Sequence, residues 1–243
     1  CPASPVHYQF DPVQTTKTNV HGAINMLGLA KRLKVRILQA STSEVYAREQ
    51  KGFPVKEDAP LGSTSPYAAQ KIAAEEYIRS RAAASGLRFT ITRPFNTISR
   101  STVGNPHFVV ERAITQALQE GRIHLHDALP RRDFVFRDDH VSAYRFIVEQ
   151  LNGPMADDMV NRTFNVCTGD CWSILRMANE VATLVGERQG RPVPVSWETA
   201  RTTASFCKTS FSRSAVFRPC FWLPWNLGPV AAGVPSSLAL LRA

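Results

Sequence analysis

Residues 35–46, VRILQASTSEVY, and residues 65–71, SPYAAQK, decide the fold class of this chain. The first stretch opens with an apolar run that predicts a buried strand over residues 35–41, and a hydroxyl-rich segment with a carboxylate follows it. The second stretch opens with Ser65 as a helix N-cap and Pro66 in the first helical turn. A buried strand followed by a helix is the repeating unit of a parallel α/β sheet.

The polar residues of these two stretches predict a reactive site. Ligands of open α/β sheets bind beyond the carboxyl ends of the strands, so we expect Thr42, Ser43 and Glu44 to lie there. Tyr67 and Lys71 are four residues apart on the predicted helix, which places the phenol and the ammonium on one face. A tyrosine that acts as a base near neutral pH needs its pKa lowered by about 3 units, and a nearby cation favours the phenolate.

Hydrophobic periodicity continues the alternation of helix and strand along the chain. Apolar positions at helical spacing predict a helix over residues 12–33, and the helix that carries Tyr67 is expected to end at Gly86. A doubly wound parallel sheet accounts for this order. Further strands are expected over residues 87–92, 132–136, 162–166 and 193–197, and further helices over residues 107–120, 138–151 and 173–185.

Thr42, Tyr67 and Lys71 together resemble the catalytic triad of the extended short-chain dehydrogenase/reductase family, in its branch of nucleotide-sugar epimerases, 4,6-dehydratases and decarboxylases. The resemblance runs from residue 1 to about residue 198. The Tyr-x-x-x-Lys element alone is a weak signal, but the combination is specific. Five further stretches carry it, namely CPASPVHY at 1–8, KTNV at 17–20, TRPFNT at 92–97, RRDFV at 131–135 and FNV at 164–166.

The resemblance implies that the intact enzyme uses NAD and acts on a nucleotide sugar. Tyr67 would take the proton of a sugar hydroxyl while hydride leaves the same carbon, and Thr42 would hydrogen-bond that hydroxyl. Lys71 would hold the cofactor ribose and lower the pKa of Tyr67. Tyr67, Lys71 and Pro94 are the implied cofactor contacts.

The implied substrate-binding residues lie further along the chain. Asn96 looks like the residue that reaches the substrate diphosphate, although an asparagine there also suits a turn cap. Arg132 resembles the arginine that meets a phosphate or, in a decarboxylating relative, the reacting sugar, with a solvated strand end as the alternative. Asn19 is expected to be a structural polar residue on the preceding helix. The resemblance also implies a cytoplasmic homodimer.

Glu44 bears on the reaction. A carboxylate is needed when a second step follows oxidation, such as abstraction of the proton next to the new ketone. This favours 4,6-dehydration of a nucleoside diphosphate hexose through a 4-keto intermediate. A UDP-glucuronate decarboxylase and a 4-epimerase are the alternatives, because residues 1–31 look most like the decarboxylases whereas residues 65–69 look like the dehydratases and epimerases.

The glycine-rich turn that cradles a dinucleotide in this family is not found. None of the 13 glycines falls into a Gly-x-Gly-x-x-Gly pattern. Because the sequence starts at Cys1 with no strand before the first loop, we expect a fragment that lacks the first half of its nucleotide-binding domain and is inactive as it stands. A non-catalytic binding module of the same fold is the alternative from another functional class.

These observations predict a partial Rossmann-type sheet over residues 1–97 and a smaller substrate-binding lobe, interwoven with the end of the sheet, over residues 98–198. Residues 199–243 contain five basic residues and no acidic one, so we expect a frameshifted or mis-spliced tail. The preceding 198 residues carry 24 basic and 20 acidic groups, which leaves only +4 of the net charge of +9. This distribution argues against a nucleic-acid-binding protein.

Composition bounds the remaining possibilities. The sequence has no run of about 18 apolar residues, so no membrane span is expected. Five irregularly spaced cysteines favour reduced thiols over a disulfide framework. No metal site is expected either, because four of the histidines read as surface or loop residues, namely His107, His124, His126 and His140.

Overall fold

The computed structural model describes four stretches of the chain, namely residues 10–47, 55–63, 65–100 and 107–198. They divide into two compact units. The first unit comprises, among the described residues, 10–47, 55–63, 65–95 and 140–166, and the second comprises 96–100, 107–139 and 167–198. The chain therefore leaves the first unit after Phe95 and returns to it at His140. The family-like stretch at 1–8 and the tail at 199–243 lie outside the described residues.

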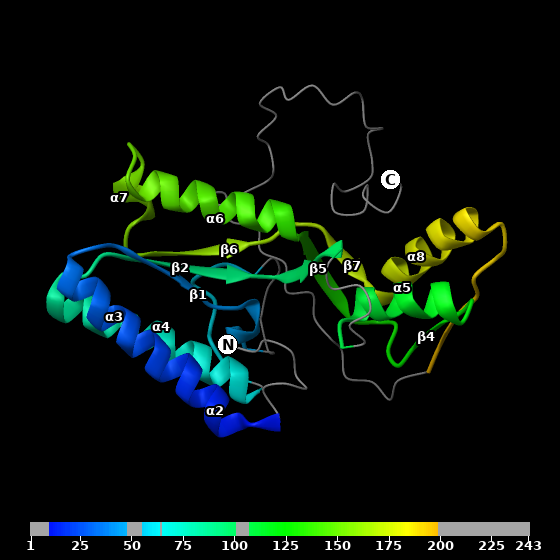
Figure 1. The fold of residues 1–243 in the computed structure, drawn as a ribbon, viewed down its shortest axis with the longest axis horizontal. Helices are drawn as coiled ribbons and strands as arrows, with labels where there is room; N and C mark the ends of the chain where they lie inside the picture. Colours follow the sequence, from blue (N-terminus) through cyan, green and yellow to red (C-terminus); the bar gives the residue numbers. More distant parts are fainter. Residues whose placement is uncertain (1–9, 48–54, 64, 101–106, 199–243) are drawn as a thin grey trace. The chain divides into compact units, whose positions relative to one another are not determined.

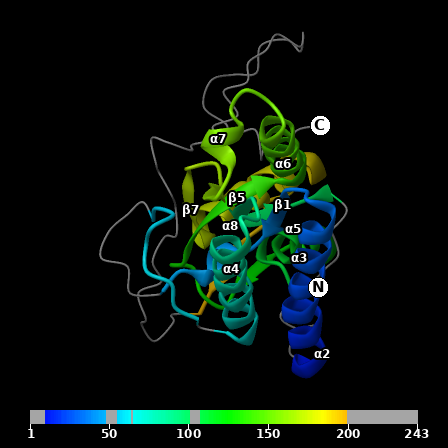
Figure 2. The same ribbon diagram turned by 90° about the vertical axis from the view of Figure 1, so that its left-hand side faces the viewer.

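The first unit is built on a parallel sheet of three strands in the order β1-β2-β6, with β1 at Ile37–Ala40, β2 at Phe89–Pro94 and β6 at Arg162–Val166. Helices α3 (Gly22–Leu33) and α4 (Pro66–Ser85) cover one face of the sheet, and α6 (Arg137–Leu151) covers the other (Figures 1 and 2). The short helix α7 (Ala156–Met159) precedes β6. This arrangement bears out the predicted α/β fold class.

The N-terminal helical segment has three parts. Helix α2 (Pro12–Thr16) runs through a π-helical turn, η1 (Lys17–His21), into α3. The predicted helix over residues 12–33 is thus confirmed. Lys34 ends α3 in the left-handed conformation, at φ 55°, and the amide of Val35 donates back to the carbonyl of Ala30 at 3.0 Å. Because this bond keeps Val35 with the helix, the predicted strand start at residue 35 is wrong, and β1 begins at Ile37.

Helix α4 forms as the sequence predicts. Ser65 accepts a hydrogen bond from the amide of Ala68 at 3.1 Å, Pro66 occupies the first turn, and Gly86 ends the helix at φ 65°. Its inner face packs Ile78 against Leu27 of α3 and Ile91 of β2. The predicted strand over residues 87–92 is found two residues later, as β2.

The second unit contains two small sheets. In the first, β5 (Arg131–Phe136) lies between β3 (Asn96–Ile98), which runs parallel to it, and β7 (Cys171–Ser173), which runs antiparallel. In the second, β4 (Ile123–Leu125) pairs in parallel with β8 (Val195–Trp197). The three-residue strands β3, β4 and β7 were not predicted, whereas the three-residue β8 lies inside the strand expected over residues 193–197.

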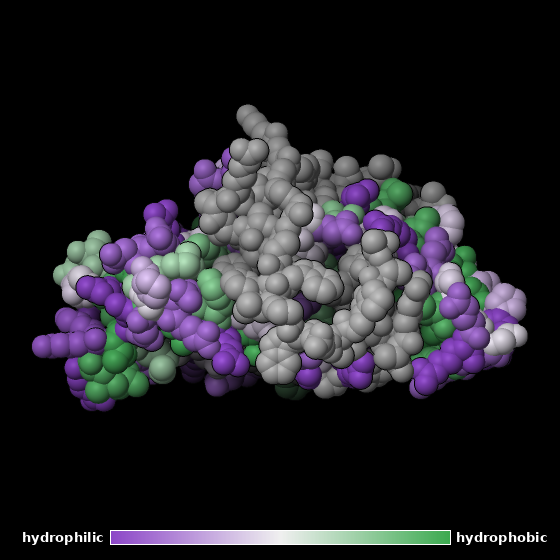
Figure 3. Space-filling view, turned by 90° about the horizontal axis from the view of Figure 1, so that it is seen from above, coloured by the Kyte–Doolittle hydropathy of each residue, from purple (hydrophilic) through white to green (hydrophobic). Residues whose placement is uncertain are grey.

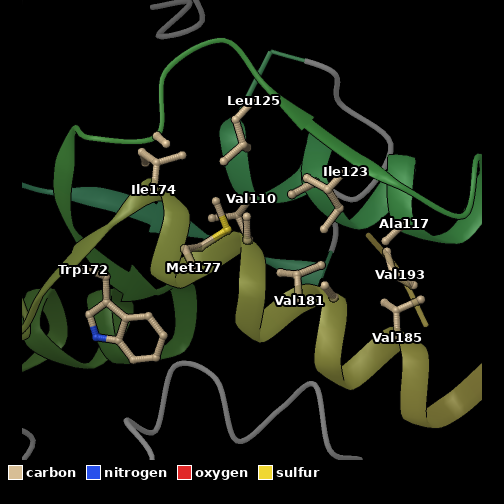
Figure 4. Close-up of a cluster of buried hydrophobic side chains, with 14 of the residues drawn as sticks. Val110, Ala117, Ile123, Leu125, Trp172, Ile174, Met177, Val181, Val185 and Val193 are labelled. Atoms are coloured by element: carbon tan, nitrogen blue, oxygen red, sulfur yellow. The ribbon is translucent and has the colours of Figure 1, made fainter. Parts of the chain in front are cut away.

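Helices α5 (Val109–Gln119) and α8 (Ile174–Gln189) form the apolar centre of the second unit. Their bounds are close to those of the helices predicted over residues 107–120 and 173–185. The α8 residues Met177, Val181 and Val185 recur at helical spacing and are buried against Val110 of α5 and Ile123 of β4 (Figure 4). Ser173 caps the helix by accepting from the amide of Arg176 at 3.0 Å.

The described surface mixes hydrophilic and hydrophobic side chains (Figure 3). In the first unit, large exposed apolar side chains gather along α2, α3 and the segment after it, where Val13, Met26, Leu33 and Val35 are each about half exposed or more. No helix in the described stretches is both long enough and apolar enough to cross a membrane.

Candidate active site

The segment after β1 presents Thr42, Ser43 and Glu44 in a single 3-10 turn, η2 (Ser43–Val45). Thr42 is buried and its hydroxyl accepts from the amide of Glu44 at 3.3 Å, which caps the turn. Ser43 is half-buried and Glu44 is exposed. The predicted position of these three residues beyond the carboxyl end of a parallel strand is therefore the one observed.

Tyr67 and Lys71 lie one turn apart near the start of α4. Tyr67 is buried, and Lys71 Nζ lies 5.7 Å from the centre of its ring. The same Nζ donates to the carbonyl oxygen of Ala40 at 3.0 Å. The predicted common face is thus observed, and the end of β1 holds the ammonium next to the phenol.

The ammonium of Lys71 stands in a partly desolvated setting. Burial lowers the pKa of Lys71 below its usual value, and the charge of Glu75 one turn later opposes this shift. A cation that has lost part of its hydration interacts more strongly with a neighbouring phenolate or ribose hydroxyl than a fully solvated one. The role of Lys71 in lowering the pKa of Tyr67 stays a prediction.

Glu44 reaches the start of α4. Its Oε2 accepts from the hydroxyl of Ser65 at 3.5 Å, a long bond across the two segments that carry the candidate catalytic set. Helix N-termini favour negative charge, so the setting suits a carboxylate. The exposed carboxyl group remains accessible for exchange of a proton.

A buried polar network, which the sequence analysis missed, underlies this set. Arg93 donates from Nε to Glu75 Oε1 at 3.0 Å and from Nη2 to Glu75 Oε2 at 2.6 Å. Arg93 Nη1 also donates to the hydroxyl of Tyr46, which bonds Asn165 at 2.6 Å. Glu75 lies on α4 one turn beyond Lys71, so the network fixes the helix against the ends of β2 and β6.

Two pKa shifts follow from this network. Burial opposes the ionisation of Glu75, but the hydrogen bonds and charge of Arg93 outweigh it, so its pKa lies below the usual value. Burial raises the pKa of Tyr46 to about 12, although Arg93 counteracts the shift. Tyr46 is therefore a neutral structural phenol, unlike the proposed base Tyr67.

The remaining predicted site residues lie in two different units of the chain. Pro94 ends β2 in the first unit, half-buried and opposite Val166 of β6. Asn96 and Arg132 belong to the second unit, on the neighbouring strands β3 and β5. Asn96 is exposed and donates from Nδ2 to the carbonyl of Asp133 at 3.0 Å, whereas Arg132 donates from Nη1 to the carbonyl of Arg131 at 2.8 Å.

Asn19 confirms its predicted structural role. It lies buried in the π-helical turn and donates from Nδ2 to Gln70 Oε1 at 2.7 Å. Gln70 in turn donates to the hydroxyl of Thr16 at 2.6 Å. This chain of bonds joins the N-terminal helical segment to α4 beside Lys71.

The cysteines give a mixed outcome. Of the described cysteines, Cys167 is not in a disulfide, whereas Cys171 is disulfide-bonded, so the expectation of reduced thiols is wrong for Cys171. The pair therefore offers no two-thiolate metal ligand set.

Tyr67 and Lys71 suit one part of a dinucleotide cofactor, the nicotinamide and its ribose. The buried phenol of Tyr67 and the ammonium of Lys71 suit a ribose hydroxyl and the adjoining nicotinamide. A pyrophosphate requires backbone amides at a glycine-rich turn, and the sequence carries no Gly-x-Gly-x-x-Gly. The side chains of Tyr67 and Lys71 thus suit the reactive end of the cofactor, and their contact with it stays a prediction.

Comparison with known proteins bears on the family and the fold of the chain. A family model described as "NAD dependent epimerase/dehydratase family" matches residues 3–167. UDP-glucuronic acid decarboxylase 1 of Arabidopsis thaliana is 35% identical over 191 residues, which cover 76% of this chain and 42% of that protein. UDP-glucuronic acid decarboxylase 6 of the same plant is 42% identical over 124 residues, covering 49% of this chain and 36% of the relative. The chain thus spans less than half the length of these relatives.

Solved structures show the same fold. The UDP-glucose 4-epimerase of Thermotoga maritima with UDP-glucose superimposes with a TM-score of 0.70 at 24% identity, over 86% of this chain and 65% of that one. The dTDP-glucose 4,6-dehydratase of Bacillus anthracis with NAD gives a TM-score of 0.65 at 23% identity, over 80% and 59% respectively. At these identities the likeness establishes the fold alone.

Proposed function

Because the chain belongs to the NAD dependent epimerase/dehydratase family, we propose that it carries the catalytic residues of a nucleotide-sugar enzyme that oxidises C4 of the sugar and then decarboxylates UDP-glucuronate. The contact of Lys71 Nζ with the carbonyl of Ala40, beside the ring of Tyr67, carries the oxidation half of the proposal. The two decarboxylases from Arabidopsis thaliana, at 35% and 42% identity, favour the second half.

The oxidation step uses three side chains. Tyr67, as the phenolate, removes the proton of the C4 hydroxyl, and the Thr42 hydroxyl hydrogen-bonds the same oxygen. Lys71 favours the phenolate through its charge and binds the ribose. NAD, when bound, accepts the hydride that leaves C4 and later returns it.

The second step depends on the substrate. With a glucuronate, the new C4 ketone makes the carboxylate on C5 a β-keto acid, which loses carbon dioxide and leaves an enolate at C5. Glu44 in its acid form then delivers a proton to C5, and hydride returns to C4. Arg132 would hold the departing carboxylate or a phosphate, and Asn96 the diphosphate.

A 4,6-dehydration, which the sequence alone favours, is the second candidate. With a 6-hydroxy hexose, Glu44 would take the C5 proton, the C6 hydroxyl would leave as water, and hydride would return to C6. The exposed Glu44 next to Ser65 supports a C5 proton transfer in either direction, so it does not separate the two reactions. The decarboxylase relatives favour decarboxylation as the first candidate.

Products distinguish the candidates. The protein expressed from its complete open reading frame is incubated with UDP-glucuronate and, separately, with UDP-, dTDP- and GDP-hexoses, and the products are weighed by mass spectrometry. Loss of carbon dioxide from UDP-glucuronate is expected, with one deuterium at C5 when the solvent is D2O. Loss of water from a hexose would establish the dehydratase, and unchanged mass with an inverted C4 an epimerase. No turnover together with no retained NAD would establish a non-catalytic module.

Two substitutions test the assigned roles. Tyr67→Phe should lower kcat by about 10²- to 10⁴-fold, because the base is lost. The matched control is Tyr77→Phe on the same helix, which removes a hydroxyl from outside the candidate set and should leave kcat unchanged. The Glu44→Gln variant should still oxidise C4 to the ketone, but the reaction should stop before the proton is transferred to C5. A Glu44→Gln variant with normal product formation would remove Glu44 from the mechanism.

A further inference from the structure

Two histidines and a carboxylate meet at the β4–β8 pair of the second unit. His124 and His126 are two residues apart along the line of β4, which places them on one face, while Leu125 between them is buried in the apolar core. Glu198 follows β8, and its amide donates to the carbonyl of Leu125 at 3.1 Å. Strand pairing therefore brings Glu198 to His124 and His126, which precede it by 74 and 72 residues, and all three side chains face solvent.

The three ligand atoms are close to coordination spacing. Glu198 Oε1 lies 3.5 Å from His124 Nε2 and 3.9 Å from His126 Nδ1, and the ligand atoms all lie within 4.8 Å of one another. Ligand atoms about 3.4 Å apart are expected around a tetrahedral Zn²⁺ with bonds of about 2.1 Å. Small rotations of exposed side chains close the difference.

Ser196 supplies a second, independent observation. The Ser196 hydroxyl lies 3.4 Å from the carbonyl of Ile123 and 3.1 Å from His124 Nδ1. If it donates its proton to the carbonyl, it accepts from His124 Nδ1–H, which leaves the lone pair of His124 on Nε2. That lone pair faces the Glu198 carboxylate, and two such atoms repel unless a proton or a metal cation lies between them. Metal-ligating histidines are commonly oriented in this way through their other nitrogen.

We propose that His124, His126 and Glu198 form a binding site for one divalent cation of the Zn²⁺, Co²⁺ and Ni²⁺ class, with Ser196 as a positioning residue. Two imidazole nitrogens and one carboxylate suit these borderline ions, whereas Mg²⁺ and Ca²⁺ take oxygen ligands. The bound ion links β4 to the segment after β8 and stabilises that pair, with water completing the coordination. The site shares no residue with the proposed catalytic set and does not depend on the proposed function.

Metal titration tests the site directly. Zn²⁺ is titrated into the protein at about pH 7.5 in competition with a chromophoric chelator, and Co²⁺ binding is followed by its visible absorption bands. We expect one equivalent bound above the level of a variant that combines His124→Gln, His126→Gln and Glu198→Gln. Each single substitution should weaken Zn²⁺ binding about tenfold or more, and Ser196→Ala should weaken it less. Mg²⁺ should not compete.

Control variants separate this site from other metal contacts. His21→Gln removes an exposed histidine of the first unit and should bind Zn²⁺ like the unchanged protein. Zn²⁺ should raise the Tm of the unchanged protein and of His21→Gln but not that of the triple variant. The chelator assay reports binding even where a variant changes the Tm by itself. Equal Zn²⁺ binding by the unchanged protein and the triple variant would leave only a histidine–carboxylate ion pair and overturn the proposal.

Discussion

Two carboxylates, Glu75 in the first unit and Asp133 in the second, are both completely buried but have opposite surroundings. Glu75 faces the guanidinium groups of Arg93 at 2.6 Å and Arg79 at 2.9 Å. Among the described residues, Asp133 accepts from neutral donors, namely the amide and hydroxyl of Thr168 at 2.9 and 2.8 Å and the amide of Gly169 at 2.7 Å, and the like charge of Asp170 also acts on it. The pKa of Glu75 is lowered, whereas burial raises that of Asp133 to about 6 against these hydrogen bonds.

The difference shows that hydrogen bonds alone do not replace the hydration of a buried carboxylate. A cation at hydrogen-bonding distance restores the charged form, and three neutral donors do not. The two sites also differ in what they join. Glu75 holds a helix against the end of a parallel sheet beside the candidate catalytic residues, whereas Asp133 ties β5 to the turn between β6 and β7.

Removal of the guanidinium of Arg93 should have the largest effect. Arg93→Met keeps most of the apolar side chain but leaves the buried Glu75 charge with Arg79 as its remaining ion-pair partner in the described part of the chain. We expect the free energy of unfolding of the first unit to fall by about 3–5 kcal/mol. Urea unfolding, followed by hydrogen-exchange mass spectrometry of β2 and α4 peptides, measures it unit by unit.

Arg79→Met is the matched control, because the Arg79 side chain is 35% exposed and solvent screens its charge. Its effect should be clearly smaller. The double variant Glu75→Gln/Arg93→Met removes the stranded charge and should recover part of the loss. If Arg93→Met and Arg79→Met are equally destabilising, the ion pair is not what stabilises Glu75.

The free energy of unfolding of the second unit should change with pH in the opposite direction from that of the first unit. The pKa of Asp133 is about 6 when folded and about 3.9 when unfolded, so the folded state binds more protons between these values and stability falls as the pH rises from about 4 to about 6. The full shift corresponds to roughly 3 kcal/mol. Glu75 has a lowered folded pKa, so its contribution is present above the unfolded value and is lost only as the pH falls through the folded one.

Unfolding of β5 and β7 peptides in urea at several pH values measures this slope. Asp133→Asn should abolish most of it, and the remaining slope should come from Asp139, whose pKa is also raised by burial. Asp157→Asn, at an exposed position of the first unit, should leave the slope of the second unit unchanged. A slope that survives Asp133→Asn undiminished would assign it to another group.

Loss of one neutral donor to Asp133 should have a smaller effect. Thr168→Val keeps the shape and the backbone donor but removes the hydroxyl that bonds Asp133 Oδ1 at 2.8 Å. We expect a loss of about 1–3 kcal/mol at neutral pH and a further rise in the pKa of Asp133, because the charged form loses a partner. Thr183→Val, at an exposed position of α8, is the same substitution and should change stability by less than about 0.5 kcal/mol.

The parts of the molecule predicted from the sequence are those set by local signals. The caps Ser65, Pro66 and Gly86 bound α4, and the four-residue spacing of Tyr67 and Lys71 placed them on one face, as observed. The position of Thr42, Ser43 and Glu44 was predicted from the rule that ligands of open parallel sheets bind beyond the carboxyl ends of the strands. These signals lie within a few residues of the feature that they predict.

The parts that the sequence analysis missed depend on distant partners. Arg93 meets Glu75 across 18 residues and Asn165 meets Tyr46 across 119, and neither pair has a sequence pattern of its own. Glu198 reaches His124 only because two three-residue strands pair, so the proposed metal ligand set could not be read from histidine spacing. The roles of Asn96 and Arg132 stay predictions, because they lie in a different unit from Tyr67.

A partly buried hydrogen bond between two neutral groups should have the smallest effect on stability. In the first unit, Thr92 Oγ1 and the Tyr144 hydroxyl lie 2.8 Å apart. Tyr144→Phe should lower stability by only about 0.5–1.5 kcal/mol, because a neutral pair exchanges bonds with water at little net gain and Thr92 retains the carbonyl of Gln39 at 3.5 Å. Tyr77→Phe on α4 provides the control for loss of a half-buried phenol hydroxyl. A loss from Tyr144→Phe as large as that from Arg93→Met would mean that burial of any polar group, rather than of charge, determines the energetics of both units.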